Sequence, residues 1–382
     1  MTRNEKRNIF ILLCSGCISI SFNVAAIVAV LPSMAVDLDV NAVAISRILP
    51  AYMIPYGLGA LIYAPLMRLF SCRIILYVPL CVYSLAAFLC FWDQSLGTLM
   101  LGRMVMGVSG ASIIPIALIL IGKIFARDVR GRLVGLLFGT SFISSIAGIT
   151  LGGLVHWRWL FGVPAVLGLL TAIGISSVRS GFLSHVHGYR ANYFKAMQYP
   201  PIGKIFIFIF FMSALYHGVH KWFGLYLSRE YILNQTAISM IFIAMSLSSS
   251  AGQILGGFVA DKQGRNQAVI CGLVILTLAT LILCGHYPLL LLIGNLLLFS
   301  AGWTVGHTGV STILTDFPDQ FRPEIASLNS SVRFLAGGIG VSLSSLLVEA
   351  SFQMTFFIIG LMMAVLLVLH RPFLPTEKNT CI

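Results

Sequence analysis

The stretch Gly257-Phe258-Val259-Ala260-Asp261-Lys262-Gln263-Gly264-Arg265 decides the fold, because it is a short polar turn set between two long apolar runs. A degenerate copy lies about 193 residues earlier, again between apolar runs, and reads Ala64-Pro65-Leu66-Met67-Arg68-Leu69-Phe70-Ser71-Cys72-Arg73. This offset is about half of the 382-residue chain. The repetition indicates an internal duplication of a membrane-spanning unit, and such duplications are typical of transport proteins.

The composition places most of the chain in lipid. Hydrophobic residues make up 58% of the sequence and charged residues only 9%, whereas a soluble protein has about 25% charged residues. The apolar runs reach the roughly 20 residues needed to cross a hydrocarbon core of about 30 Å. Because backbone groups in lipid must hydrogen-bond within their own segment, these runs are expected to be helices. The predicted fold class is an all-α polytopic membrane protein.

Twelve spans can be placed along the sequence, six in each half. They are 9–31, 44–66, 73–92, 96–122, 132–154, 159–178, 204–227, 236–260, 267–286, 288–314, 325–348 and 353–370. The largest break between spans is 179–203, which contains Pro200-Pro201 and several basic or histidine residues. We therefore expect a six-helix bundle over 1–178, a cytoplasmic linker over 179–203 and a second six-helix bundle over 204–382.

The basic residues set the expected orientation. If both termini are cytoplasmic, eighteen Lys and Arg residues fall in inside segments and three fall in outside loops, namely Arg47, Arg158 and Arg229. Basic residues favour the cytoplasmic side, so both termini are expected there, in a bacterial inner membrane. The net charge of +12 is scattered over short loops rather than gathered on one face, which argues against a nucleic-acid partner.

The sequence offers no pattern for a cofactor, a metal or an enzyme. Cys14 and Cys17 form a C-x-x-C pair inside an apolar run with no second ligand pair, so small packing residues are the simpler interpretation. No H-E-x-x-H, no G-x-S-x-G and no paired mid-membrane carboxylates are present. We expect a lipid-embedded protein, most simply a monomer, that binds a small-molecule substrate.

Several motifs sharpen this interpretation. Gly102-Arg103-Met104-Val105-Met106-Gly107-Val108-Ser109-Gly110-Ala111 lies in the fourth span, and Gly148-Ile149-Thr150-Leu151-Gly152-Gly153 lies in the fifth. The segment after the fifth span reads His156-Trp157-Arg158-Trp159-Leu160-Phe161-Gly162-Val163-Pro164. Together with the paired loops and twelve spans, the chain resembles the major facilitator superfamily over essentially its whole length. The first stretch is similar to the R-x-x-x-G-x-x-G-A segment of this family. The other two resemble the G-P-x-x-G-G and W-R-W-x-F segments of its drug:proton antiporters.

The resemblance implies two pseudo-symmetric six-helix bundles that alternate access to a central site, with protons as the coupling ion and efflux as the direction. Two positions depart from the pattern. Arg68 stands where the family has aspartate, and Ile149 replaces the proline of the antiporter segment. Both departures bear on whether the protein is an antiporter of the usual kind.

The loop around Asp261 is predicted to be a conformational latch. A carboxylate beside Lys262 and Arg265 can pair with a basic residue or cap a neighbouring helix. Gly256, Gly257 and Gly264 would allow close helix contact and a tight turn. The simpler alternative is a loop that only satisfies the positive-inside rule.

Glycines of the fifth span are predicted to pack helices closely. Gly148, Gly152 and Gly153 are spaced for close packing, and Ser144 and Gly148 continue a pattern in which small residues recur at every fourth position.

Polar residues inside the spans are the candidate substrate- or proton-binding residues, because ionisable groups in lipid are costly and usually functional. This candidate set is Asn23, Arg103, His217, Lys221, His307 and Arg333. For Lys221 the alternative is a side chain that extends to the outer surface beside Trp222. For the histidines and Arg333 the alternative is a packing role. Tyr52 and Tyr56 share a helix face and are weaker candidates for a cavity wall with Trp222 and Trp303.

The acidic residues all fall in loops or at span ends, so the buried ionisable residues are expected to be basic. Basic groups in a low-dielectric cavity attract anions. This leaves two hypotheses for transport: proton-coupled multidrug efflux, or a dedicated transporter of an anionic or zwitterionic metabolite such as a siderophore or organic acid. If protons are coupled, a histidine is the expected carrier. A non-transporting membrane sensor is the alternative outside transport.

Overall fold

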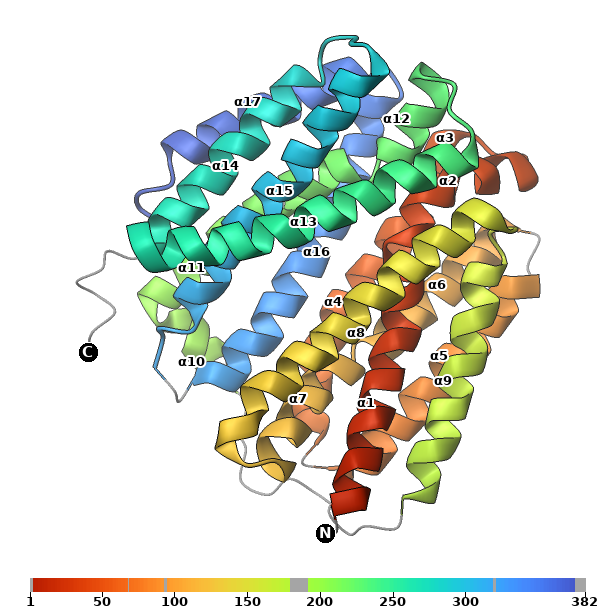
Figure 1. Ribbon diagram of the computed structural model, residues 1–382, viewed down its shortest axis with the longest axis vertical. Coiled ribbons are helices and arrows are strands. Elements are labelled where there is room, and N and C mark those ends of the chain that lie inside the picture. Colours follow the sequence, from red (N-terminus) through yellow and green to blue (C-terminus); the bar gives the residue numbers. More distant parts are fainter. Residues whose placement is uncertain (1–2, 68, 93–94, 179–191, 319–320, 375–382) are drawn as a thin grey trace. The chain divides into compact units, whose positions relative to one another are not determined.

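The regular secondary structure in the described part of the chain is helical. The computed structural model describes residues 3–67, 69–92, 95–178, 192–318 and 321–374, and no strand occurs among them. The chain separates into two compact units, Met1–Ala191 and Asn192–Ile382 (Figure 1).

The helices of the first unit are α1 (Arg3–Val24), α2 (Ala26–Asp37), α3 (Ala42–Ser46), α4 (Ile48–Leu66), α5 (Cys72–Trp92), α6 (Leu96–Gly110), α7 (Ile113–Ile124), α8 (Arg127–Leu154) and α9 (Trp159–Ser177). Those of the second unit are α10 (Tyr193–Gln198), α11 (Pro200–His220), α12 (Phe223–Glu230), α13 (Gln235–Gln263), α14 (Arg265–Ile282), α15 (Leu289–Leu314), α16 (Arg322–Val348) and α17 (Phe352–Val368).

The predicted all-α polytopic fold is confirmed. Four predicted spans each consist of two helices joined by a turn, namely α1 with α2, α3 with α4, α6 with α7, and α11 with α12. Within the described residues, eleven segments are long and apolar enough to cross a membrane. The last predicted span corresponds to α17, which has 17 residues.

The predicted linker is only partly described. Residues 179–191 lie outside the described residues, and the remainder of 179–203 contains α10 and the first turn of α11. Asn192 caps α10 by accepting a hydrogen bond from the Lys195 N–H at 2.9 Å. Pro200 is tolerated in the first turn of α11, where its missing N–H has no intrahelical partner to lose. The described end of the expected linker is therefore helical.

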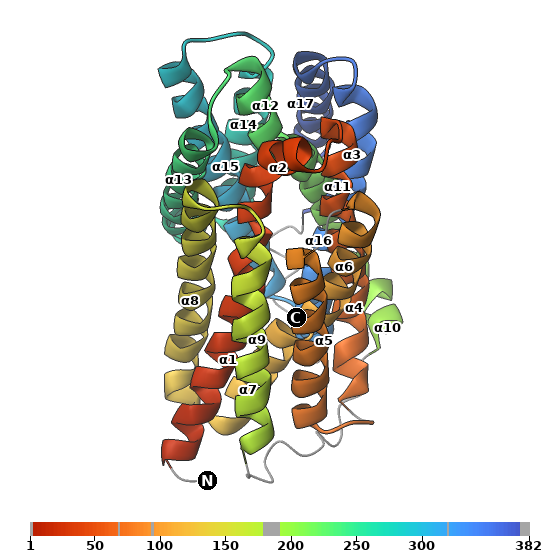
Figure 2. The ribbon, with the colours of Figure 1, turned by 90° about the vertical axis from the view of Figure 1, so that its right-hand side faces the viewer.

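The two units repeat the same internal contacts at the offset seen in the sequence. Asn41 caps α3 through the Ala44 N–H, and Asn234 caps α13 through the Ala237 N–H. In the first unit α1 packs on α8, α4 on α6 and α5 on α9, while in the second unit α11 packs on α16, α13 on α15 and α14 on α17. Figures 1 and 2 show α1 between α8 and α9. The duplication inferred from one loop pair thus extends to caps and helix packing.

Large apolar side chains remain exposed on both units. The exposed fractions of Leu85, Leu290 and Leu346 are 61%, 80% and 72%. Exposed apolar surface of this extent would be unfavourable in water. A lipid environment accounts for it, because lipid tails are as apolar as the side chains that contact them.

Candidate functional site

Arg103 occupies the centre of a buried polar cluster in the first unit. Gly107 lets α6 approach α4 closely, because a Cβ at this position would overlap the backbone carbonyl of Tyr52. One turn before Gly107, the Arg103 guanidinium carbon lies 4.2 Å from the centroid of the Tyr52 ring. The Arg103 side chain is fully buried, with 2% of the residue exposed. The close contact between α4 and α6 therefore places a charge on an aromatic face.

Asn23 joins this cluster from α1. Arg103 donates from Nη1 to Asn23 Oδ1 at 3.4 Å and from Nε to the Ile48 carbonyl at 3.5 Å. Both distances exceed the usual N–H···O range of about 2.7–3.2 Å. Among the described residues, no carboxylate forms an ion pair with Arg103. The structure therefore brings the predicted residues Asn23 and Arg103 together, with the cation only weakly satisfied.

Tyr52 was only a weaker candidate from the sequence, and the structure gives it a closer relation to Arg103 than expected. Its ring lies 5.7 Å from that of Tyr56 on the same helix. Nearby, the Tyr83 hydroxyl donates to the Ser19 carbonyl at 3.2 Å. The sequence signal for this set was present in the four-residue spacing of Tyr52 and Tyr56. Nothing in the spacing indicated that Arg103, on another helix, would stack on Tyr52.

A second cluster, formed by aromatic and histidine side chains, lies in the second unit. Tyr216 of α11 stacks on Trp303 of α15 with ring centroids 3.9 Å apart. His307 stacks on the same indole at 5.6 Å, and His217 lies 5.9 Å from it. The Arg333 guanidinium carbon of α16 lies 6.0 Å from the Trp303 centroid. Three predicted residues, His217, His307 and Arg333, therefore converge on one tryptophan.

His220 and Phe299 extend this cluster and were not among the predicted site residues. The His220 ring stacks on Tyr216 at 5.1 Å, and Phe299 stacks on the same ring at 5.3 Å. A sequence signal existed, because 216 and 220, and likewise 299, 303 and 307, recur at four-residue spacing. Such spacing places side chains on one helix face. We call Tyr216, His217, His220, Phe299, Trp303 and His307 the aromatic–histidine cluster.

The histidines of this cluster retain hydrogen-bonding capacity. Within the described structure, Nδ1 of His217, Nδ1 of His220 and Nε2 of His307 are buried without a hydrogen-bond partner. Buried polar atoms are normally satisfied, so such atoms require an explanation. The described His, Cys, Asp and Glu residues include no group of three placed to hold a metal ion. The free nitrogens are therefore available to a polar ligand or to water.

Lys221 and Trp222 are both buried, unlike in the alternative that the sequence left open for Lys221. Lys221 immediately follows α11 and is buried, with 6% of the residue exposed. Trp222 is completely buried, and its indole N–H donates to the Ser344 Oγ at 2.8 Å. Neither side chain therefore extends to an outer surface. Trp222 acts instead as a hydrogen-bonded packing residue.

The predicted latch loop joins α13 to α14. Gly264 has a φ of 104°, a backbone conformation that favours glycine because it lacks a Cβ. Arg265 forms an ion pair with Asp316 at the end of α15. Lys262 lies over the Phe258 ring, with its Nζ 4.6 Å from the ring centroid. In the described part of the chain, Asp261 has no ion pair, so the loop's ionic contact is made by Arg265 and not by Asp261.

The loop's glycines do not act alike. A Cβ at Gly256 would lie 2.9 Å from the Cα of Val305, so Gly256 is the residue at which α13 and α15 approach. A Cβ at Gly257 would meet no described atom within 4 Å. The expected close helix contact thus belongs to Gly256 and not to Gly257. In the first loop, Arg68 stands at the position that corresponds to Asp261, and it lies outside the described residues.

Two glycines of α8 lie in close contact with neighbouring helices. A Cβ at Gly148 would overlap the backbone carbonyl of Phe22, and a Cβ at Gly152 would lie 2.8 Å from Val30. These contacts hold α8 against α1 and α2. Gly153 is partly exposed on the same helix. The second unit repeats the first contact at Gly340 of α16, where a Cβ would overlap the carbonyl of Ala214.

Glu324 corrects the expectation that buried ionisable residues are all basic. It lies at the start of α16, as the sequence suggested, but only 4% of the residue is exposed. Its Oε1 accepts a hydrogen bond from the Asn192 N–H at 3.0 Å, which ties α10 to α16. Burial raises the pKa of the neighbouring Tyr193 hydroxyl, and the Glu324 carboxylate raises it further. Glu324 therefore lies at the end of a span and is nevertheless buried.

The W-R-W segment forms a contact near the end of α2. Asp37 Oδ2 accepts from the Trp157 indole N–H at 2.7 Å and lies 2.6 Å from His156 Nε2. The Arg158 guanidinium carbon lies 4.7 Å from the Trp157 ring centroid. One carboxylate thus connects α2 to the turn between α8 and α9.

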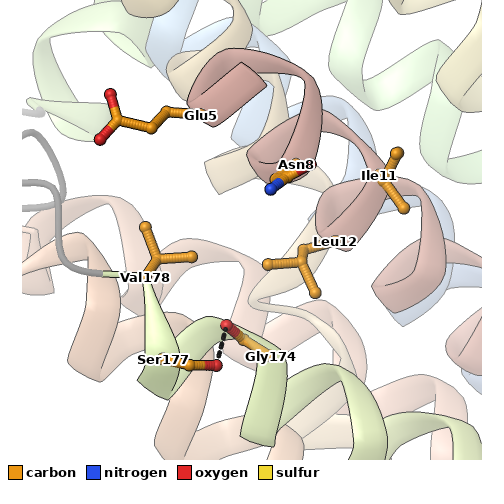
Figure 3. Close-up of a pocket in the computed structure, with 7 residues that line it drawn as sticks. All are labelled: Glu5, Asn8, Ile11, Leu12, Gly174, Ser177 and Val178. Carbon is orange, nitrogen blue, oxygen red and sulfur yellow. Dashed lines mark hydrogen bonds between the residues drawn. The ribbon is translucent and has the colours of Figure 1, made fainter. Parts of the chain in front are cut away.

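A pocket of about 560 Å³ opens between the first turns of α1 and the last turn of α9 (Figure 3). Glu5, Asn8 and Leu12 line it from α1, and Ser177 and Val178 line it from the end of α9. The Ser177 hydroxyl donates to the Gly174 carbonyl at 3.0 Å. None of the predicted site residues lines this pocket, which is separate from the Arg103 cluster.

Comparison with known proteins fits this architecture. The sequence profile of the Major Facilitator Superfamily matches residues 11–218 and 205–380. The chain therefore belongs to the major facilitator superfamily, and it is a membrane transport protein rather than an enzyme.

Individual relatives are distant. The chain is 24% identical to the uncharacterized transporter YwfA of Bacillus subtilis, over 78% of this chain and 74% of that protein. It is 35% identical to the efflux pump aflT of Aspergillus parasiticus, over 30% of this chain and 23% of that protein. Among solved structures, a bacterial homologue of the human lysosomal transporter Spinster matches with a TM-score of 0.79 and 13% identity, over 98% of both chains. That likeness shows the fold alone.

Proposed function

We propose that this protein is a secondary active transporter that exports a small organic solute by alternating access, with protons as the coupling ion. Membership of the superfamily supports alternating access between two units. The partial similarity to an efflux pump, together with the antiporter-like stretches at 102–111 and 148–164, supports the outward direction. The basic residues support an inner-membrane location with both termini cytoplasmic.

The observation that carries this proposal is the buried polar chemistry inside the spans of each unit. Arg103 lies within the first unit, and His217 and His307, the two histidines around Trp303, lie within the second. Ionisable groups within a membrane are costly and mark substrate or ion pathways. A histidine can take up and release a proton near neutral pH. We therefore assign substrate and proton binding to Asn23, Arg103, His217, Lys221, His307 and Arg333.

The loop at 257–265 is proposed to act as the conformational latch, with the ion pair of Arg265 and Asp316 as its ionic contact. Gly257, Asp261 and Lys262 complete this loop, and Gly264 supplies its turn. The packing glycines Gly148, Gly152 and Gly153 are proposed to hold α8 firmly against its neighbours during the exchange between states.

A dedicated transporter of an anionic or zwitterionic metabolite is the second candidate. It is favoured by the cationic side chain of Arg103, which is buried well inside a span and forms no ion pair with a carboxylate of the described residues. Unlike charges attract strongly where the dielectric constant is low. The two candidates differ in the charge of the substrate, and this difference can be measured directly.

Transport by purified protein in liposomes tests the proposal. A pH gradient, acidic on the side to which the substrate is exported, should drive uptake of a solute into inverted proteoliposomes, and a protonophore should stop it. Ethidium as probe represents cationic drugs, and hippurate represents organic anions. Accumulation of ethidium supports multidrug efflux, and accumulation of hippurate supports the second candidate. Exchange of neither probe, in either direction and at any pH gradient, would count against the function proposed.

A further inference from the structure

We infer that Arg103, Asn23 and Tyr52 form a binding site for a single carboxylate, carried by the substrate. We call these three residues the Arg103 site. The inference rests on the proposed transport function, because it names the chemical group that the first unit would recognise. In this inference the carboxylate binds to donors of the first unit alone.

The charge balance of the cluster is the first argument. Arg103 is 2% exposed, and a guanidinium cannot be deprotonated in proteins, so a full positive charge is buried. Removing an ion from water costs several kcal/mol unless a counter-charge or strong hydrogen bonds replace the water. The described residues supply a ring face and two hydrogen bonds, at 3.4 Å and 3.5 Å, and no carboxylate ion partner. The cluster therefore lacks an anion.

The neighbouring polar atoms are the second argument. Asn23 is completely buried, and its Nδ2 has no hydrogen-bond partner in the described structure, while its Oδ1 already accepts from Arg103. The Tyr52 hydroxyl is also buried without a partner. An amide nitrogen and a guanidinium can only donate, and a tyrosine hydroxyl can donate. The unused capacity of the cluster thus consists of donors, and the complementary ligand is an acceptor.

Space next to the Tyr52 hydroxyl is the third argument. Gly110 faces it from α6, and a Cβ at Gly110 would lie 3.3 Å from the hydroxyl oxygen, 3.5 Å from Ile20 and 3.6 Å from Tyr83. The missing side chain leaves this side of the hydroxyl free of a Cβ. Gly110 is the second glycine of the motif that begins at Arg103, so one stretch of α6 supplies the charge and also leaves the Tyr52 hydroxyl uncovered by a side chain of its own.

The shape of the donors favours a carboxylate. A guanidinium presents its N–H groups as a planar fork, which matches the two oxygens of a carboxylate. A spherical halide offers only one acceptor atom to this fork, whereas a carboxylate offers one oxygen to each N–H. The amide of Asn23 and the hydroxyl of Tyr52 come from α1 and α4, so they would reach a planar oxyanion from two further sides.

The test measures ligand-dependent thermal stability of the full-length protein purified in detergent. The probes are hippurate, its neutral analogue hippuramide, and chloride. Hippurate is expected to stabilise the wild-type protein with saturable concentration dependence, and hippuramide is not. Arg103→Gln should abolish this stabilisation, and Tyr52→Phe should weaken the apparent affinity about tenfold, as expected for loss of one hydrogen bond to a charged group.

A third variant keeps the test decisive if Arg103→Gln fails to fold. Asn23→Asp places a carboxylate beside the guanidinium, so it should raise the melting temperature without ligand and remove the response to hippurate. Arg229→Gln is the matched control, because it removes one exposed cation elsewhere and should leave the response unchanged. Equal stabilisation by hippurate and hippuramide, a response to chloride that matches hippurate, or a full hippurate response in Asn23→Asp would each overturn the inference.

The binding test and the transport test can fail separately. If hippurate binds in an Arg103-dependent way but no solute is exchanged in liposomes, the site stands and the proposed function fails. If ethidium or another solute is exchanged while no variant changes hippurate binding, the function stands and the carboxylate site does not exist.

Discussion

At the scale of single residues, Trp303 organises the second unit's polar chemistry, because Tyr216, His217, His307 and Arg333 all contact its indole. Aromatic pairs contribute about 0.5–1.5 kcal/mol beyond the area they bury. The stack also fixes the rings of two histidines. The properties of this cluster therefore depend on one side chain that carries no charge itself.

Replacing this tryptophan should affect stability and transport together. Trp303→Ala removes the stack on Tyr216, so we expect a loss of at least about 1 kcal/mol of stability and a strong fall in transport rate. Trp92→Ala is the control, because Trp92 is 66% exposed and should be nearly silent in both assays. Denaturation in detergent and liposome transport provide the two measurements. Wild-type transport by Trp303→Ala would show that the cluster only packs.

The histidines give a prediction about pH. If one of them carries the coupled proton, its replacement by glutamine should leave substrate counterflow intact but remove accumulation driven by a pH gradient. The test compares His217→Gln, His220→Gln and His307→Gln with wild type over a range of pH. A pH-gradient response that survives in all three variants would assign the proton to another group, of which the buried Glu324 is the next candidate.

At the scale of helices, glycines decide where neighbours touch. α8 offers a matched pair, because a Cβ at Gly148 would overlap the Phe22 carbonyl, while a Cβ at Gly139 would meet no described atom within 4 Å. The same substitution thus has opposite physical consequences at two points of one helix.

We predict that Gly148→Ala is destabilising by about 1–3 kcal/mol, the range for overpacking a close contact. Gly139→Ala should instead be neutral or stabilising by up to about 1 kcal/mol, because alanine favours the helix. Gly340→Ala should behave like Gly148→Ala if the second unit repeats the contact in solution. Unfolding of each variant in detergent measures the differences, and equal effects at Gly148 and Gly139 would contradict the packing described.

At the scale of the whole chain, the distribution of basic residues predicts the orientation in the membrane, with both termini cytoplasmic. A fluorescent protein fused to the C-terminus should fluoresce in bacteria, since fluorescence requires a cytoplasmic position. Alkaline phosphatase fused after Tyr231 should be active, because the α12–α13 turn is expected to face outward. Inactive phosphatase at this turn, together with a dark C-terminal fusion, would reverse the orientation.

The sequence by itself was sufficient for the all-α fold class, the spans, the superfamily and the internal repeat. These properties depend on local composition and spacing, since apolar runs of sufficient length must be helical in lipid whatever their neighbours. The sequence also singled out Arg103, His217 and His307, because charge inside an apolar run is visible without a structure. It could likewise show that Gly264 occupies a turn.

Only the tertiary structure decided which of these residues meet. Arg103 stacks on Tyr52 and reaches Asn23, although 80 residues separate Arg103 from Asn23 along the chain. The Arg265 partner proved to be Asp316, and of the two adjacent candidates Gly256 and Gly257 only Gly256 makes the close helix contact. Glu324 lies at a span end and is nevertheless buried under α10. Such contacts depend on helix rotation and crossing, which are set by packing between segments distant in sequence, so no local pattern records them.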